Sequence, residues 1–527
     1  MKTSAHYRFS LYSLLLGFLT LAAYAYAPAG EFLWDDEMIV GMLTNPHIDP
    51  LKQVFNPATL EVRNYFRPIA NLSFVADFHI WGLNPLGFHL SNILYHLCVV
   101  LALFWVLGRH FSLTGAFWSA ALFAVHPLHA ETVTPVFSRC GIFEAILLPG
   151  LWLFSGKKET TWPRWTFHVL VSLVLFVLAL LSKESAVVFP AILTLYFLLF
   201  QLTLDTGARR QKIATLAAFW VLALVFVVLR FSWIPVGDSQ VLSLIADQPL
   251  QVRLWTFFES FLKYLGLVIF PVHLHMERHF VSEWTSPGAL IGLAMMLVIF
   301  ISAWRYRRTN PHFLFGFCWL LIWLSPMSNI VIPLPMTMAE RWMYLPSIGL
   351  FWILADRIDW LHETSRRRRS LAVALSGLLA ILMARTFART LDWKDGATLY
   401  SRDLEKSPNS FLLHNNLGVI ETREGRHERA HAHFNRAVEI RPTYGTAVNN
   451  LGAMEERFGN VDKAADHYAK AIQVSGYHVA YANLAKILLR RGDWQTARRL
   501  LEEGYSRHPQ DREIYDLLTA IRTSSSP

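Results

Sequence analysis

Three consecutive carboxylates, Asp35, Asp36 and Glu37, follow an apolar run that ends near Pro28. A carboxylate close to hydrocarbon loses hydration, so it persists where it faces water, a cation or a reacting group. Taken alone, the stretch is equally compatible with a solvated loop that carries a few acids. It is therefore a candidate acid–base site at a membrane edge, and the polar residues that follow decide between the two interpretations.

A polar stripe lies on the apolar segment that follows the first long loop. His89, Asn92 and His96 are spaced at i, i+3 and i+7, which places them on one face of a helix. Such a face must point into the bundle or into a wet cavity. The stripe has two interpretations, hydrogen bonding between helices and orientation of a substrate by His89.

The densest polar stretch runs from His126 through His129 and Glu131 to Arg139. Two histidines and a glutamate can ligate zinc, but no His-Glu-x-x-His helix is present and Pro127 indicates a helix end. We therefore predict no metal site. The pattern favours His126, His129 and Glu131 as groups that orient substrate hydroxyls, with Arg139 as a phosphate ligand.

Further charges occur at the ends of other apolar segments. Arg67 and Lys183 are additional candidate phosphate ligands, although an interfacial lysine beside Glu184 is also a common arrangement. Glu340, Arg341 and Tyr344 form a last polar group: Arg341 is a candidate phosphate ligand, and Glu340 and Tyr344 are candidate substrate-orienting residues. Together with the acids, this pattern predicts a site for a phosphate-bearing substrate and a general base.

The composition shows which elements must position these residues. Hydrophobic residues make up 54% of the 527 residues and charged residues only 17%, which is typical of a multi-pass membrane protein. The net charge of +9 comes from short basic clusters between apolar runs, so nucleic-acid binding is not predicted. Cys98, Cys140 and Cys318 share no metal-ligand or disulfide spacing.

About twelve apolar segments precede residue 390, and the first, residues 9–27, is predicted to be a retained helix and not a cleaved signal peptide. The basic clusters all face the cytoplasm only if one segment fails to cross. Residues 254–271, which carry Glu259 and Lys263, are the weakest candidate. We therefore predict about eleven spans, with the 29–86 loop, the acids and the C-terminal region on the outer side.

The chain becomes polar after residue 390, and internal repeats begin. Leu417, Leu451 and Leu484 lie 34 and 33 residues apart, which is the tetratricopeptide period of two antiparallel helices. We predict a membrane domain over 1–390 and a repeat domain over 391–527, with repeats at about 409–442, 443–476 and 477–509 and a capping helix at 511–522. The fold class is therefore all-α, a polytopic membrane bundle followed by an α-solenoid.

Asparagines recur in phase on the first helix of each repeat, at Asn416, Asn450 and Asn483. A side-chain amide can hydrogen-bond a peptide backbone of any sequence, which would suit an acceptor-binding groove. Contacts between the helices of the stack are an equally good interpretation.

Several segments, in order, resemble the transmembrane-and-tetratricopeptide-repeat (TMTC) O-mannosyltransferases and their bacterial relatives. The segments are Trp34-Asp35-Asp36, Tyr65-Phe66-Arg67-Pro68, Phe88-His89-Leu90-Ser91-Asn92 with His96, His126-Pro127-Leu128-His129-Ala130-Glu131, Ser182-Lys183-Glu184 and Glu340-Arg341-Trp342-Met343-Tyr344-Leu345-Pro346-Ser347. The resemblance covers nearly the whole chain. Two departures are the third acid, Glu37, and the sequence Leu274-His275-Met276-Glu277, where the family usually has an aspartate.

The resemblance implies a GT-C fold, a polyprenyl-phosphate sugar donor and inverting transfer in the outer compartment, with Asp35 or Asp36 as the base. No cofactor is expected. The expected partners are membrane lipid and an acceptor protein. The topology predicted above, in a bacterial inner membrane, puts the repeats on the periplasmic side. A hexose such as mannose is the expected sugar. A non-catalytic membrane-anchored scaffold for envelope assembly, and transfer to a glycolipid or polysaccharide, remain alternatives.

Overall fold

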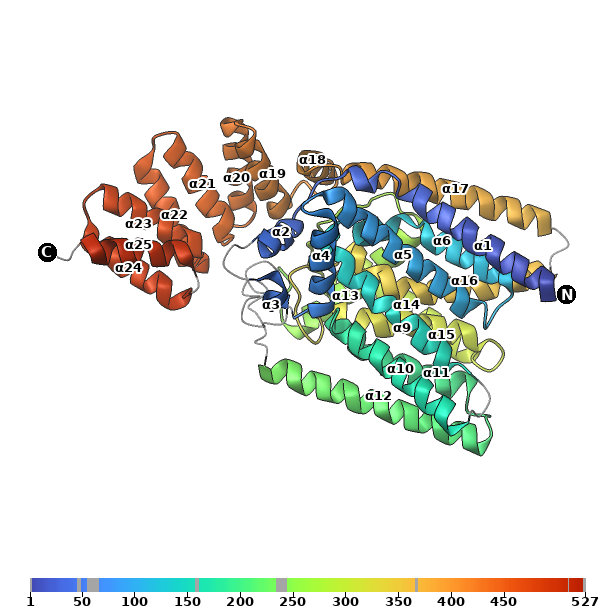
Figure 1. The fold of residues 1–527 in the computed structure, drawn as a ribbon. Coiled ribbons are helices and arrows are strands. Elements are labelled where there is room, and N and C mark those ends of the chain that lie inside the picture. The colour runs from blue at the N-terminus through green and yellow to red at the C-terminus, as the bar shows by residue number, and fades with distance from the viewer. Residues whose placement is uncertain are drawn as a thin grey trace. The chain divides into compact units, whose positions relative to one another are not determined.

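The computed structural model describes residues 2–44, 49–54, 66–156, 161–233, 244–364, 368–509 and 511–524. Over these residues the chain is helical, and its one β contact is an isolated bridge between Arg278 and Met338. The chain forms two compact units that meet in sequence between Asp395 and Gly396 (Figure 1). The predicted all-α class is confirmed.

Unit 1 is a bundle of long helices joined by short helical turns. Its helices are α1 (Lys2–Ala23), α2 (Asp36–Thr44), α3 (Pro50–Val54), α4 (Pro68–Trp81), α5 (Pro85–Leu107), α6 (Leu113–Ala124), α7 (Ala130–Val133), α8 (Arg139–Phe143), α9 (Leu147–Phe154), α10 (Trp162–Leu180), α11 (Phe189–Phe200), α12 (Thr206–Trp233), α13 (Leu250–Ile269), α14 (Pro287–Arg305), α15 (Pro311–Leu324), α16 (Tyr344–Thr364) and α17 (Arg368–Asp392). The predicted domain boundary, between residues 390 and 391, falls near the end of α17.

Short 3₁₀ turns connect these helices where the polar residues of the candidate site lie. They are η1 (Ala27–Ala29), η3 (Pro127–His129), η4 (Val136–Ser138), η5 (Glu144–Ile146), η6 (Glu184–Val188), η8 (Ser325–Met327) and η9 (Glu340–Met343). Pro127, Pro135 and the polar residues between them interrupt the regular i to i−4 pattern, so residues 125–146 fold as a series of short turns. This segment contacts α4, α5, α16 and α17, and so brings polar groups of these helices together.

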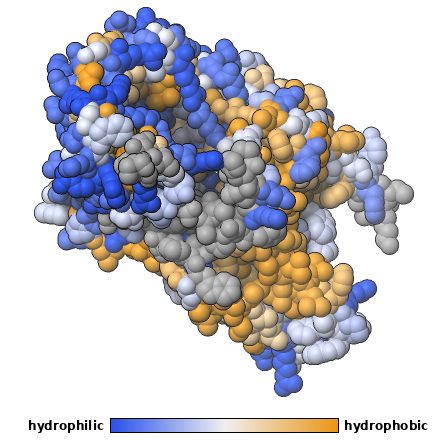
Figure 2. Space-filling view, turned by 60° about the vertical axis from the view of Figure 1, so that its left-hand side comes forward, coloured by the Kyte–Doolittle hydropathy of each residue, from blue (hydrophilic) through white to orange (hydrophobic). Residues whose placement is uncertain are grey.

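Seven helices in the described part of the chain are long and apolar enough to cross a membrane, by length and composition. They cover His6–Ala29, Pro85–Leu107, Val136–Phe154, Trp162–Leu180, Thr206–Ser232, Pro287–Arg305 and Arg368–Asp392, and three shorter apolar helices cover Leu113–Ala124, Glu184–Phe200 and Pro311–Met327. Neither α13 nor α16 is in either group. Hydrophobic side chains cover much of the outward face of unit 1 (orange in Figure 2), which is typical of a multi-pass membrane protein.

The helix ends and crossings of unit 1 follow from local sequence. Asn84 and Ser112 cap α5 and α6 by accepting hydrogen bonds from first-turn backbone N–H groups. Helices α15 and α16 cross at Gly316 and Gly349, where a Cβ on either glycine would lie within 2.3 Å of the other's carbonyl oxygen. Such a close crossing requires glycine on both helices.

Unit 2 is a series of antiparallel helix pairs that repeats the predicted tetratricopeptide pattern. After α18 (Gly396–Lys406) come α19 (Phe411–Arg423), α20 (His427–Ile440), α21 (Gly445–Arg457), α22 (Val461–Ser475), α23 (His478–Arg490), α24 (Trp494–Arg507) and α25 (Arg512–Ser524). Each turn within a pair contains a glycine with positive φ: Gly425 at 76°, Gly459 at 84° and Gly492 at 78°. Glycine is favoured there because other residues rarely adopt this backbone conformation.

Candidate active site

The acidic stretch lies at the start of α2, and its two aspartates have different surroundings. Asp36 is fully buried and accepts hydrogen bonds from the backbone N–H groups of Leu33 at 3.1 Å, Phe137 at 2.7 Å and Val136 at 3.4 Å. Burial raises the pKa of Asp36 to about 7, although these three donors oppose the shift. Asp35 is only partly buried. Asp36 therefore fixes the loop onto η4, and Asp35 is the more accessible carboxylate.

The same loop holds an aromatic ring against a cation. Trp34 adopts a φ of 55°, a conformation that costs a tryptophan about 1–3 kcal/mol and persists where the surroundings enforce it. Its ring packs edge-on against Phe137 at a centroid distance of 5.3 Å, and the guanidinium carbon of Arg341 lies 5.2 Å from the Trp34 ring. The acidic loop and η9, about three hundred residues apart in the chain, therefore meet at one place.

Glu131 connects Arg341 to the short turns of residues 125–146, called the central turns below. It is fully buried, and it pairs with the Arg341 side chain and accepts a hydrogen bond from the Arg341 backbone N–H at 3.2 Å. Burial raises the pKa of Glu131, and the Arg341 charge opposes this shift. The two contacts fix the direction of the Arg341 guanidinium.

All four predicted phosphate ligands pair with a carboxylate. Arg67 lies 3.2 Å from Glu184, Lys183 lies 3.0 Å from Glu144, Arg139 lies 2.6 Å from Asp77, and Arg341 pairs with Glu131. The side chains of Arg67, Lys183 and Arg341 keep 22%, 13% and 19% of their surface exposed, whereas that of Arg139 keeps none. Three of the four cations are therefore accessible to an incoming anion.

A narrow pocket brings two of these cations together. Its lining includes Lys183 and Arg341 with Glu144, Ser185 and Tyr344. Gly141 also faces this pocket, because a Cβ at this position would lie 3.9 Å from the Lys183 ammonium. The pocket therefore holds two cations beside the Glu144 carboxylate and the Ser185 hydroxyl, near the start of α9 and the end of α10.

Arg139 belongs to a buried network of hydrogen bonds and one ion pair. Its guanidinium pairs with Asp77 and donates to the Asn92 side-chain oxygen at 2.6 Å, to the Ser73 hydroxyl at 3.0 Å and to the Phe88 carbonyl at 3.0 Å. These partners use the guanidinium donors and join α4, α5 and α8. In this structure Arg139 positions its neighbours and has no exposed surface for a phosphate.

The polar stripe on α5 contacts the backbone of the central turns. His89 Nδ1 lies 2.7 Å from the Thr134 carbonyl, Asn92 donates to the Pro135 carbonyl at 2.8 Å, and His96 Nε2 lies 3.1 Å from the Ala124 carbonyl. These bonds satisfy backbone groups that the interrupted helix leaves open. They correspond to the interhelix interpretation of the stripe.

His126 and His129 are also engaged at both ring nitrogens. His126 Nδ1 accepts from the Leu128 N–H at 3.2 Å, and its Nε2 lies 3.0 Å from the Val268 carbonyl of α13. His129 contacts the Phe123 carbonyl at 2.9 Å and the Ser347 hydroxyl at 3.1 Å, and burial lowers its pKa well below the usual value. The Tyr344 ring packs against His129 at a centroid distance of 5.1 Å, and its hydroxyl lies 2.7 Å from His96 Nδ1.

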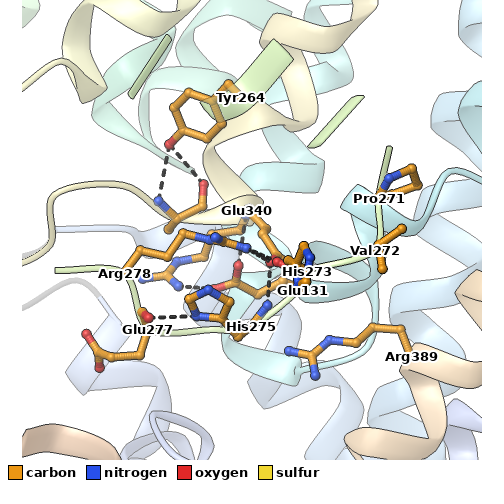
Figure 3. A network of polar contacts seen from close by, with 12 residues as sticks. Glu131, Tyr264, Pro271, Val272, His273, His275, Glu277, Arg278, Glu340 and Arg389 are labelled. Carbon is orange, nitrogen blue, oxygen red and sulfur yellow. Dashed lines mark hydrogen bonds and ion pairs between the residues drawn. The ribbon is translucent and has the colours of Figure 1, made fainter. Parts of the chain in front are cut away.

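Glu340 connects the segment after α13 to η9. Its Oε1 accepts from the His275 backbone N–H at 2.6 Å and from Arg278 at 2.8 Å, and Arg278 also donates to the His273 carbonyl (Figure 3). The side chain of Glu340 is fully buried. A buried carboxylate paired in this way holds the 273–278 segment against the site.

The in-phase asparagines of unit 2 bond to neighbouring asparagines, Asn415 and Asn449. Asn450 donates to Asn415 at 3.0 Å, Asn483 donates to Asn449 at 3.1 Å, and Asn416 accepts from Asn415 at 3.3 Å. This ladder links the first helices of successive repeats. It corresponds to the stack-contact interpretation of these asparagines.

The residues 2–44, 49–54, 66–156, 161–233, 244–364, 368–509 and 511–524 contain no group of three or more His, Cys, Asp or Glu side chains arranged to hold a metal ion. Sequence reasoning missed two functional neighbours, Asp77 and Glu144, the partners of Arg139 and Lys183. Both are acids inside or beside apolar helices, and an acid in such a place is a signal in itself.

Comparisons with known proteins agree with this architecture. A family model described as tetratricopeptide repeat matches residues 478–521, and another with the same description matches residues 381–445. The chain is 26% identical over 456 residues to Protein O-mannosyl-transferase F38B6.6 of Caenorhabditis elegans, covering 82% of this chain and 63% of that protein. It is 25% identical over 469 residues to Protein O-mannosyl-transferase TMTC4 of Mus musculus, and the match covers 77% of this chain and 63% of that protein. It is 24% identical over 480 residues to Protein O-mannosyl-transferase TMTC3 of Homo sapiens, and the match covers 82% of this chain and 51% of that protein.

A solved structure, the APC/C hetero-tetramer Cut9-Hcn1, matches 88% of this chain with 15% identity and a TM-score of 0.27. This value is too low to support an argument about the fold. The chain spans 51–63% of the length of the three curated relatives named above. It is a multi-pass, tetratricopeptide-repeat protein, and its relatives over most of the chain are O-mannosyl-transferases of the TMTC type, so the predicted resemblance is confirmed.

Proposed function

We propose that this protein transfers a hexose such as mannose from a polyprenyl-phosphate donor to a protein hydroxyl on the outer side of a membrane. The observation that carries the proposal is the meeting of the Asp35 loop with Arg341, next to the pocket that Lys183 also lines. Glycosyltransferase activity is supported by the O-mannosyl-transferase relatives. The GT-C fold and the lipid-linked donor, which the sequence resemblance implies, are also part of this proposal.

In this mechanism Asp35 accepts the proton of the acceptor hydroxyl as its oxygen attacks the anomeric carbon. The bond between that carbon and the phosphate oxygen breaks, and polyprenyl phosphate leaves with one more negative charge than the donor carried. Lys183 and Arg341 stabilise this additional charge, as preorganised cations do best. Arg67 provides a third accessible cation, and Asp36 holds the Asp35 loop in place.

The remaining residues of the site position these groups. Glu131 orients Arg341, and Glu144 orients Lys183 at 3.0 Å. His89, His126 and His129 shape the central turns, and Tyr344 and Glu340 hold η9 against them. In our proposal the repeats recruit the acceptor, with Asn416, Asn450 and Asn483 on the binding face. A bacterial inner membrane with periplasmic repeats is part of the same proposal.

Purified protein is expected to transfer mannose from polyprenyl-phosphate mannose to an acceptor protein in the presence of EDTA. The leaving phosphate is stabilised by Lys183 and Arg341, so no metal cofactor is required. The measurement is incorporation of labelled mannose with and without the chelator. Transfer that disappears with EDTA and returns with a divalent ion would contradict the metal-free mechanism, and no transfer under any condition would contradict the donor.

The repeats are expected to lie on the same side of the membrane as Asp35. In our proposal α16 crosses the membrane and α13 does not, and neither helix is among the candidate spans by length and composition. In a variant without Cys98, Cys140 and Cys318, a cysteine at the exposed Ser506 should react with an impermeant thiol reagent from outside.

The matched control for this experiment is a cysteine at Thr206, an exposed position at the start of α12 beside the basic Arg209 and Arg210. Positive-inside bias places it in the cytoplasm, so it should react only after permeabilisation. If the Ser506 cysteine instead behaves like the Thr206 cysteine, the repeats are cytoplasmic and acceptor recruitment to this site is wrong.

A further inference from the structure

A second cavity lies at the other ends of the helices that carry the candidate site. It has a volume of about 920 Å³, its open mouth included, and lies between the end of α9 and the starts of α10 and α12. The α10 residues that line it run from Trp165 to Ser172, and eight more residues of α10, about 12 Å at 1.5 Å per residue, follow before the Ser182–Lys183 turn. The cavity shares no lining residue with the pocket at Lys183 and Arg341 and is not part of the site described above.

Two cations face this cavity, and no acidic residue does among the described residues that line it. Arg109 stacks on Trp152 with its guanidinium carbon 4.4 Å from the ring, and no described residue accepts a hydrogen bond from its side chain. Lys212 uses one of its three N–H donors, bonding to the Phe154 carbonyl at 2.5 Å. His168 lines the same wall.

This arrangement differs from the candidate active site in charge. There, Lys183 and Arg341 each have a carboxylate partner, whereas Arg109 and Lys212 have none among the described residues. Two like charges that face one cavity repel each other, and they are stabilised when an anion binds between them. The unused guanidinium and ammonium donors suit the several oxygens of a phosphate group.

The rest of the lining is apolar and aromatic. Trp152 of α9 lies against Arg109, and Trp165 and Val169 of α10 and Phe219 of α12 complete the apolar part of the lining. The outward faces of the same helices are exposed and hydrophobic, at residues that include Phe167, Leu170, Val174, Val221 and Leu224. Tryptophan beside basic residues is typical of the level of lipid headgroups. The ligand therefore has a charged head and an apolar body.

We propose that this cavity binds the phosphate headgroup of an anionic membrane lipid, with Arg109 and Lys212 on the phosphate and Trp152 and Trp165 beside the upper acyl chain. The site is independent of sugar transfer. It holds a lipid at the end of the bundle opposite the Asp35 loop, where it bridges α9, α10 and α12.

The test uses the full chain purified in detergent and titrated with phosphatidylglycerol or phosphatidylcholine, with bound lipid counted by native mass spectrometry. Phosphatidylglycerol is expected to bind at least about tenfold more tightly than phosphatidylcholine. The variant R109Q/K212Q should lose at least about tenfold in phosphatidylglycerol affinity, since one hydrogen bond to a charged group is worth about this factor. The matched control is Arg210→Gln, which removes an exposed charge from the same turn of α12 outside the cavity and should change the affinity by less than about twofold.

A second variant keeps both cations. A Cβ at Gly156 would lie 3.3 Å from Arg109 Nη2, so Gly156→Asp places a carboxylate next to the guanidinium and should also abolish the preference for phosphatidylglycerol. Equal binding of the two lipids, or equal losses in R109Q/K212Q and the control, would overturn the proposal. If inorganic phosphate competes as effectively as phosphatidylglycerol, the ligand is a free anion and the lipid assignment is wrong.

Discussion

Asp35→Asn is expected to lower sugar transfer by about two to four orders of magnitude, the usual contribution of a general base. The amide has almost the same shape as the carboxylate but accepts no proton from the acceptor hydroxyl. Asp35 is partly exposed, so its replacement should leave membrane insertion and the melting temperature unchanged. The measurement is the initial rate of mannose transfer by purified variants at equal folded concentration.

Two further variants separate the roles of the three acids. Glu37→Gln removes an exposed carboxylate two residues away and should retain most of the activity, which makes it the matched control. Asp36→Asn should lower thermal stability, because an amide offers one acceptor oxygen where three backbone N–H groups now bond to the carboxylate. Unchanged transfer by the Asp35 variant would remove the base from this loop and favour the scaffold alternative.

Arg139→Met is expected to destabilise the bundle by about 3–5 kcal/mol, because it leaves the buried Asp77 carboxylate without its cation. It also removes the donors to Asn92, Ser73 and the Phe88 carbonyl. Thermal unfolding in detergent and the yield of folded protein measure this loss. The effect is structural, and it should lower activity only in proportion to the folded fraction.

The control for this prediction is Arg67→Met, which breaks a partly exposed pair with Glu184 and should cost no more than about 1 kcal/mol. The double variant R139M/D77N should recover part of the lost stability, because the uncompensated charge is then absent. If Arg139→Met is no more destabilising than Arg67→Met, the buried network does not have the structural role that its geometry indicates.

Much of the architecture follows from the sequence because its causes are local. Apolar runs of spanning length predict membrane helices, and the phase of Leu417, Leu451 and Leu484 predicts the repeats, since each depends only on residues a few turns apart. The polar residues of the site could also be found, because a charge beside hydrocarbon is costly wherever it occurs. The acidic loop and the Glu340–Arg341 group were found in this way.

Which of those residues are buried in ion pairs and which are accessible depends on tertiary packing. Arg139 and Arg341 are alike in sequence, each beside an apolar segment, but the fold buries Arg139 on Asp77 and leaves Arg341 at the pocket beside Trp34. Likewise, Asp36 is committed to three backbone donors while the adjacent Asp35 is accessible. Ion-pair partners such as Glu131 and Arg341 lie 210 residues apart, and only the crossing of helices brings them together. Sequence therefore determines which groups are available, and packing decides which are neutralised and which remain to meet a substrate, because burial and pairing are properties of the surrounding fold and not of the residue.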